Sequence, residues 1–214
     1  MGLFLDGDGI PLAFNIFSGN KNEQPTLIPL EKQIIHDFGL SRFIVCTDAG
    51  LASKNNRRFN TLNDRSYVVT QSLKQLKNHL KEWALDCKGW HITNDPKVYD
   101  LSKIDDEKYY DTVFFKERWI NENGMEQRLI VNYSPKYKAY ERSIRERHLE
   151  CAQKIVDKGA SAKTRNQNSP TRFVMEHPVT KDGEIAEHIS RSLDNEKIHE
   201  EECYDGFSAV CTTL

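Results

Sequence analysis

The first 88 residues alternate apolar strand patterns with amphipathic helix patterns, and this alternation limits the fold more than any other feature of the chain. The patterns typical of strands cover residues 3–5, 10–17, 43–47 and 67–70. The patterns typical of helices cover residues 26–38, which Gly39 follows, and residues 53–59 and 72–85. Strands that alternate with helices build a sheet with helices packed on it. This part of the chain is therefore predicted to be α/β.

Asp6-Gly7-Asp8-Gly9 joins the first two strand patterns. Glycine and aspartate supply the positive φ angles that tight turns require, so residues 3–17 predict a β-hairpin. An alternative is catalytic, because an apolar strand that ends in Asp-x-Asp also resembles the first strand of haloacid dehalogenase-type phosphatases, with one nucleophile and one acid/base. In that alternative Asp105 and Asp106 supply the distal acidic pair. Ile10-Pro11 and the strand pattern after them favour the hairpin.

Asp48 stands directly after the apolar pattern of residues 43–47, which predicts a buried strand, and before Ala49-Gly50. The carboxyl ends of strands carry the sites of open α/β sheets. A carboxylate in such a place can hold a divalent metal, because Mg²⁺ takes one or two hard oxygen ligands together with substrate phosphate. The alternative is a helix N-cap or a turn. Asp48 is thus the candidate catalytic and metal-binding residue, although residue type alone favours the cap.

The pattern changes after about residue 88. Two strand patterns, residues 113–120 and 128–133, flank Asn121-Glu122-Asn123-Gly124 and predict a second hairpin. Residues 136–158 predict one long, highly charged helix that ends before Gly159. A turn and a final apolar strand pattern follow at residues 203–214.

Charge is unevenly distributed along a chain that is almost neutral overall. The 30 Lys and Arg residues against 32 Asp and Glu residues give a net charge of −2, which excludes a polybasic, histone-like protein. Residues 136–172 nevertheless contain ten basic and four acidic residues, a net charge of +6. Residues 182–205 contain nine acidic and two basic residues, a net charge of −7. Such a basic segment can form a local DNA-binding face.

The basic helix pattern has two interpretations. Its cations can contact DNA phosphates, with Tyr137 and Tyr140 nearby. The alternative is a solvated helix face, because residues four apart such as Glu150 and Lys154 are ordinary neighbours on a helix. The candidate DNA-binding residues are Arg142, Arg145, Arg147, Lys154 and Lys158.

The five cysteines contain no Cys-x-x-Cys pair, which predicts reduced thiols packed as small apolar residues. No apolar stretch approaches the roughly 20 residues of a membrane span. The N-terminus also lacks a basic region and a cleavage-like site. The sequence therefore predicts a cytoplasmic protein without membrane contact.

Five blocks of the sequence, in this order, carry a family resemblance. They are GLFLDGDGIPLAF at residues 2–14, FSGN at 17–20, IVCTDAGLASKN at 44–55, T-x-DGE at 180–184 and YDGFSAVCT at 204–212. Together they resemble the DDE transposases of the IS4-like type, particularly the IS1634-like group of bacterial insertion sequences. The resemblance spans nearly the whole chain.

The resemblance implies a partial RNase H-like fold with a strand-rich α+β insertion. Residues 1–88 match part of the catalytic core, residues 89–202 the insertion and residues 203–214 a returning core strand. Asp48 matches the second of the three acids that bind two Mg²⁺ (or Mn²⁺) ions in the complete enzyme. Those metals drive phosphodiester cleavage and strand transfer. The implied partners are transposon-end and target DNA and a second subunit in a homodimer, in the bacterial cytoplasm at the nucleoid.

The resemblance also implies that this chain is inactive alone. The family's first Asp is expected before Met1, and its Tyr-x2-Arg-x3-Glu helix is expected after Leu214. Glu200, Glu201 and Glu202 precede the block at residues 204–212, whereas the family's Glu follows it. The chain is therefore interpreted as a central fragment of the catalytic domain. The alternatives are a residual DNA-binding or oligomerising module and, third, the phosphatase.

Overall fold

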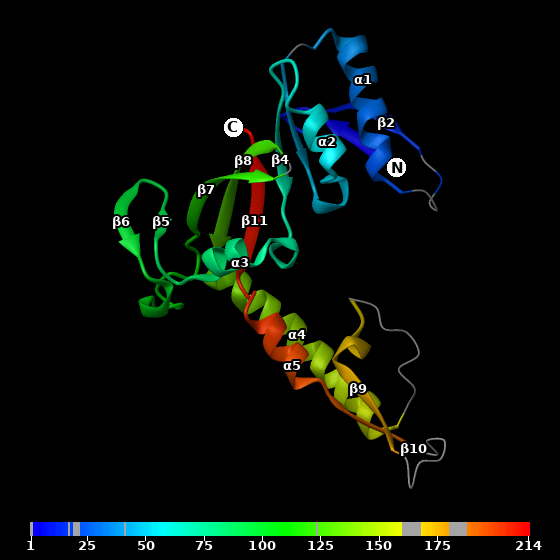
Figure 1. Cartoon of the computed structure of the whole chain (residues 1–214), viewed down its shortest axis with the longest axis vertical. Helices are drawn as coiled ribbons and strands as arrows, with labels where there is room; N and C mark the ends of the chain where they lie inside the picture. Colours follow the sequence, from blue (N-terminus) through cyan, green and yellow to red (C-terminus); the bar gives the residue numbers. More distant parts are fainter. Residues whose placement is uncertain are drawn as a thin grey trace.

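The structure is a computed structural model, and it describes residues 2–16, 18, 22–40, 42–122, 124–159, 168–179 and 188–214. The described part is a mixed α/β protein with five α-helices, a seven-stranded sheet and two separate hairpins (Figure 1). This confirms the predicted α/β class. Within the described residues, no helix is long and apolar enough to cross a membrane.

The seven-stranded sheet has the order β3-β4-β11-β8-β7-β5-β6. The strands are β3 (Ile44–Thr47), β4 (Ser66–Thr70), β5 (Trp90–Ile92), β6 (Asp95–Tyr99), β7 (Phe114–Glu122), β8 (Met125–Tyr133) and β11 (Phe207–Thr212). Only β3 and β4 pair in parallel among these strands, and the other pairs are antiparallel. The last strand, β11, lies between β4 and β8. The sheet thus takes strands from all three predicted segments and continues across the boundaries at residues 88 and 202.

The predicted N-terminal hairpin is confirmed as β1 (Gly2–Leu5) and β2 (Pro11–Asn15). Asp6 Oδ1 accepts hydrogen bonds from the backbone N–H groups of Asp8 at 3.0 Å and Ile10 at 2.8 Å. Gly9 has a φ of 81°. Asp6 therefore closes the turn, and residues 2–16 do not form the strand, loop and helix that a phosphatase site needs. Besides β7–β8, two further hairpins pair β5 with β6 and β9 (Val174–Val179) with β10 (His188–Leu193).

Most predicted helices are confirmed. The helices are α1 (Leu27–Phe38), α2 (Lys54–Phe59), α3 (Asn78–Leu85), α4 (Pro135–Asp157) and α5 (Asn195–Glu202). Gly39 ends α1 with a φ of 62°, a left-handed cap that glycine adopts without strain. Ser134 caps α4, and Pro135 occupies its first position, where no backbone donor is needed. The long helix α4 runs away from the sheet with α5 beside it (Figure 1).

The single helix predicted for residues 72–85 is wrong. A short 3₁₀ helix, Leu73–Gln75, is followed by an extended residue, Leu76, before α3 begins at Asn78. Leu73, Leu76 and Leu80 are all buried against the sheet. The spacing of these leucines therefore indicated only that one side of the segment is buried. A broken helix buries that side as well as a continuous helix does.

Two predictions of burial are also wrong. Cys211 is buried, but Cys46, Cys87, Cys151 and Cys203 are exposed; all five are free thiols. In β3 only Val45 is buried, and Ile44 is 53% exposed. The reason is that β3 lies at the end of the sheet, where the described residues provide a partner on one side only.

Lys116 lies within the main core, 5% exposed. Its ammonium group is 5.1 Å from the Trp83 ring centroid and 4.5 Å from that of Trp90, and it donates to the backbone oxygen of Asp86 at 2.7 Å. Burial lowers the pKa of Lys116 from 10.5 to about 8. The charged form is therefore less favoured in the folded chain than in the unfolded chain.

This difference predicts a pH dependence of stability. Between pH 8 and 10.5 the unfolded chain binds more protons at Lys116 than the folded chain, so this group makes the free energy of unfolding rise with pH. We expect the stability of the wild type relative to Lys116→Met to rise by about 2–3 kcal/mol over this window. Urea unfolding at a series of pH values measures it. Lys97→Met, at an exposed lysine of β6, is the control and should show no such trend.

Candidate functional site

Asp48 lies where the sequence predicts it, directly after β3. It is exposed, and its Oδ1 accepts a hydrogen bond from the backbone N–H of Leu51 at 3.3 Å. Asp48 thereby caps the short 3₁₀ helix Ala49–Leu51. The structure therefore has the helix cap that was the alternative interpretation of Asp48. The other carboxylate oxygen of Asp48 takes no part in this cap.

The described residues do not fit a two-metal centre. Among them, no three His, Cys, Asp or Glu side chains gather closely enough to hold a metal ion. Asp48 is one exposed carboxylate at a strand end, and a two-metal clamp needs several ligands held around both ions. The metal-binding role of Asp48 therefore stays a prediction, and no catalytic step is derived through a metal.

Buried polar side chains hold the Asp48 loop to the rest of the fold. The Asn56 amide donates to the backbone oxygens of Leu51 at 2.9 Å and Gln24 at 3.0 Å. Asn60 donates to the buried Glu31 carboxylate at 2.9 Å, and burial raises the pKa of Glu31. These contacts fix the loop after Asp48 against α1 and α2.

Arg57 ties the same loop to the sheet, a role that the sequence analysis missed. Its side chain is buried and donates to the Ala52 backbone oxygen at 3.1 Å, to Gln127 at 3.0 Å and to Gln71 at 2.7 Å. Gln127 also accepts from the Tyr67 hydroxyl at 2.7 Å. Gln127 is fully buried on β8, but it precedes the predicted strand pattern of residues 128–133, so the sequence pattern gave no signal of this role.

The structure separates the five candidate DNA-binding residues. Arg145 is buried, and its two terminal nitrogens donate to both carboxylate oxygens of Asp205 at 2.5 and 2.6 Å. Arg142 is exposed but also reaches Asp205, at 3.4 Å. Arg147, Lys154 and Lys158 are exposed. We therefore remove Arg145 from the DNA-facing set, because its charge is already matched inside the fold.

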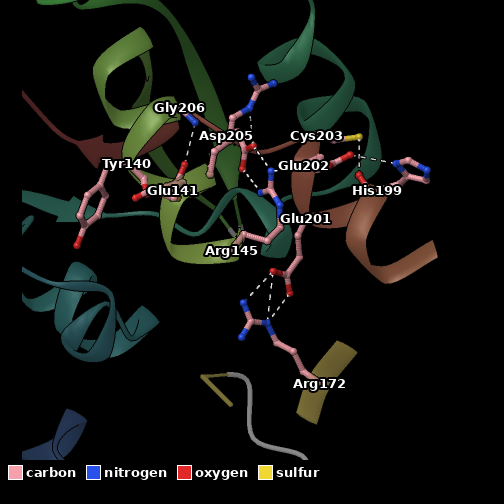
Figure 2. A network of polar contacts seen from close by, with 12 residues as sticks. Tyr140, Glu141, Arg145, Arg172, His199, Glu201, Glu202, Cys203, Asp205 and Gly206 are labelled. Atoms are coloured by element: carbon pink, nitrogen blue, oxygen red, sulfur yellow. Dashed lines mark hydrogen bonds and ion pairs between the residues drawn. The ribbon is translucent and has the colours of Figure 1, made fainter. Parts of the chain in front are cut away.

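Asp205 belongs to a polar network between α4, α5 and the turn before β11 (Figure 2). Arg172 pairs with Glu201 at 3.0 Å, and the backbone N–H of Gly206 donates to Glu141 at 2.8 Å. Burial raises the pKa of Glu141. Burial, and then the neighbouring Arg172 guanidinium, lower the pKa of His148.

The three consecutive glutamates at the end of α5 are each used by a neighbouring group. Glu200 pairs with Lys197 at 2.6 Å, and Glu201 pairs with Arg172. Glu202 contacts His199 at 3.0 Å and lies 3.7 Å from Arg145. All three carboxylates are thus engaged by neighbouring cationic or imidazole groups.

A cavity of about 240 Å³ opens beside this network. Its lining includes Tyr137 and Tyr140 from α4, Tyr204, and Lys74. The Tyr137 and Tyr140 rings are nearly parallel, with centroids 6.2 Å apart and an interplanar angle of 23°. The Lys74 ammonium group lies 5.3 Å from the Tyr204 ring centroid. The sequence placed the two helix tyrosines near the basic residues but gave no sign of a cavity.

Some predicted features lie outside the described residues. They are the T-x-DGE block at residues 180–184, most of the FSGN block at residues 17–20, Asn123 in the turn of the second hairpin, and the cations at positions 163 and 165. The acidic segment is described only from residue 188 onward.

The fold and the site together define a mixed α/β protein with an exposed carboxylate at the end of a parallel strand and a long helix that carries exposed cations. Comparisons with family models, with curated proteins and with solved structures found no match to this chain.

Proposed function

We propose that this chain is part of the catalytic domain of an IS4-like DDE transposase and that DNA is its substrate. The observation that carries the proposal is the position of Asp48 at the carboxyl end of β3, beside the parallel strand β4. Strand ends of this kind are the usual place for the carboxylates of α/β enzymes. In this proposal Asp48 is the family's second acid, and the β1–β2 hairpin and the β3–β4 pair belong to an RNase H-like core.

The proposal also states that this chain has no cleavage or strand-transfer activity on its own. One acid of three cannot build the family's metal pair, so cleavage and strand transfer require the other two acids. The Mg²⁺ (or Mn²⁺) ions and the homodimer likewise belong to the complete enzyme and are proposals here.

The test is to read the genomic DNA on both sides of this reading frame and to translate all frames. We expect a strand pattern that ends in Asp upstream and a Tyr-x2-Arg-x3-Glu block downstream, in frame or one shift away. Absence of both blocks from every frame would overturn the transposase proposal. One of them alone, at the expected distance, would support it.

A second candidate function is a DNA-binding module without catalysis. It is favoured by three exposed cations, Arg147 and Lys154 on α4 and Lys158 directly after it, because each neutralised phosphate adds a salt-dependent increment of affinity. This function does not depend on the missing acids. The DNA-binding function is therefore tested by a separate measurement.

We expect Arg147→Glu to weaken DNA binding about tenfold at low salt, because the change removes one phosphate contact and adds repulsion. Binding of a labelled oligonucleotide across a salt series measures it, and the slope of log K against log salt should become less steep by about 1. Lys97→Glu, an equal charge reversal on β6, is the control and should bind as the wild type does. Equal losses in both variants would point to net charge alone.

A further inference from the structure

One line of exposed side chains runs along α4. Tyr140, Arg147 and Lys154 follow one another at intervals of seven residues, and Lys158 comes four residues later at the helix end. Residues seven apart on a helix point in nearly the same direction. All four residues are exposed. With a rise of 1.5 Å per residue, the line is about 27 Å long.

The aromatic end of this line borders the cavity of about 240 Å³. Tyr140 is 57% exposed and Tyr137 is 41% exposed. In Figure 2 the Tyr140 ring extends away from the contact between Arg145 and Asp205. Exposed, nearly parallel rings of this kind offer a flat apolar face, and an unpaired base can stack on such a face.

The carboxylates that line the cavity are already engaged. Asp205 is held by Arg145, and Glu201 is held by Arg172. Glu141 accepts the N–H of Gly206, and its raised pKa makes its negative charge less favourable. Lys74 lines the cavity over the Tyr204 ring, and among the described residues it forms no ion pair with a carboxylate, although Glu200 is near enough to interact with its charge. The cavity therefore presents aromatic rings and a cation to an incoming anion.

Three acids limit which nucleic acid fits. Glu146, Glu150 and Asp157 are exposed on the side of α4 next to the basic line, as the helical spacing places them. A single strand can follow the line from Lys158 to Tyr140 with its phosphates on the cations. A duplex would bring its second strand over the acids, and its stacked bases would offer no face to Tyr140. Charge and aromatic surface therefore favour a single strand.

We infer that this face binds single-stranded DNA, with an unpaired base stacked on Tyr140 beside Tyr137 and the backbone along Arg147, Lys154 and Lys158. The inference rests on the proposed DNA contact of α4 and adds the form of the DNA and the aromatic contact. The site is separate from Asp48, so it needs no catalysis.

The test is fluorescence anisotropy with a labelled strand of about 20 nucleotides and with the matching duplex, at the same low salt. We expect the wild-type chain to bind the single strand about fivefold more tightly than the duplex. Tyr140→Ala should weaken single-strand binding about tenfold, because stacking on one base is lost. Tyr140→Phe keeps the ring and should bind as the wild type does. Trp119→Ala, at an aromatic residue of β7 that is 60% exposed, is the matched control and should have no effect.

The outcomes separate the two proposals. If Tyr140→Ala binds the single strand as tightly as the wild type, or if the wild-type chain binds both forms equally, the single-strand inference is overturned. A loss of affinity in Arg147→Glu would in that case still support the DNA contact. If neither form binds at low salt, the DNA contact and the inference both fail. Circular dichroism of each variant confirms that the fold is kept.

Discussion

Replacing Asp205 with alanine is expected to lower the free energy of unfolding by about 3–5 kcal/mol. Asp205 and Arg145 are buried and joined by two hydrogen bonds at 2.5 and 2.6 Å. Removing the carboxylate leaves the buried guanidinium group of Arg145 with only the more distant Glu202, at 3.7 Å, as a counter-charge. The unpaired charge, more than the lost contact, causes the penalty.

Urea unfolding followed by tryptophan fluorescence measures this effect. The control is Glu117→Ala, because Glu117 pairs with Arg128 at 3.4 Å on a partly exposed face, where a pair contributes less than about 1 kcal/mol. Arg145→Met combined with Asp205→Ala should recover part of the lost stability, since no charge remains buried. A cost in Asp205→Ala no larger than that in Glu117→Ala would contradict the assignment.

The ion pair between Arg145 and Asp205 gives the YDGF block at residues 204–207 a structural role. In the sequence the block served as a mark of family resemblance. In the structure Asp205 joins α4 to the turn before β11, and Gly206 lies against the first turn of α4. A segment that holds two distant parts of a fold together constrains its residue types even without any catalytic role.

The parts of the fold that depend on local signals were predicted well. The N-terminal hairpin follows from its Asp-Gly turn, α1 ends at Gly39, and α4 ends before Gly159. Each of these boundaries is decided by the φ angle or the hydrogen-bonding groups of a few adjacent residues. Such information is fully contained in a short stretch of sequence.

The parts that depend on distant residues were missed. The short strands β5 and β6, and the β9–β10 hairpin, were not predicted, because short strands owe their conformation to the partners they pair with. Arg145 shows the same limit for the site. Its spacing on α4 matches a DNA-facing residue, but Asp205, 60 positions later, turns it into a buried ion pair.

Asp48 illustrates what position alone can and cannot supply. Its place after an apolar strand pattern predicted a carboxylate at a strand end, and the structure has one there. A metal centre, however, requires ligands from several elements at matched distances. Spacing within one segment does not give those distances, so the sequence could nominate one ligand but not assemble the set.

Gly206→Ala is expected to lower the free energy of unfolding by about 2–5 kcal/mol. The φ of Gly206 is 82°, a left-handed conformation that costs an alanine about 1–2 kcal/mol. A Cβ atom would also lie 2.8 Å from Lys138 Cβ and 2.9 Å from the Ser134 backbone oxygen. Both atoms are fixed by the first turn of α4, so the crowding adds about 1–3 kcal/mol.

Gly159→Ala separates the two contributions. Gly159 also has a positive φ, 61°, but a Cβ there meets no atom of the described residues within 4 Å, so only the conformational cost of about 1–2 kcal/mol applies. Urea unfolding of both variants gives the difference, which we attribute to the contact between Gly206 and α4. Equal losses would mean that the turn can move away from α4, and the joint at Asp205 would then be less rigid than its hydrogen bonds imply. A larger loss in Gly206→Ala, together with the cost of Asp205→Ala, would establish this turn as the point where β11 and α4 are held together.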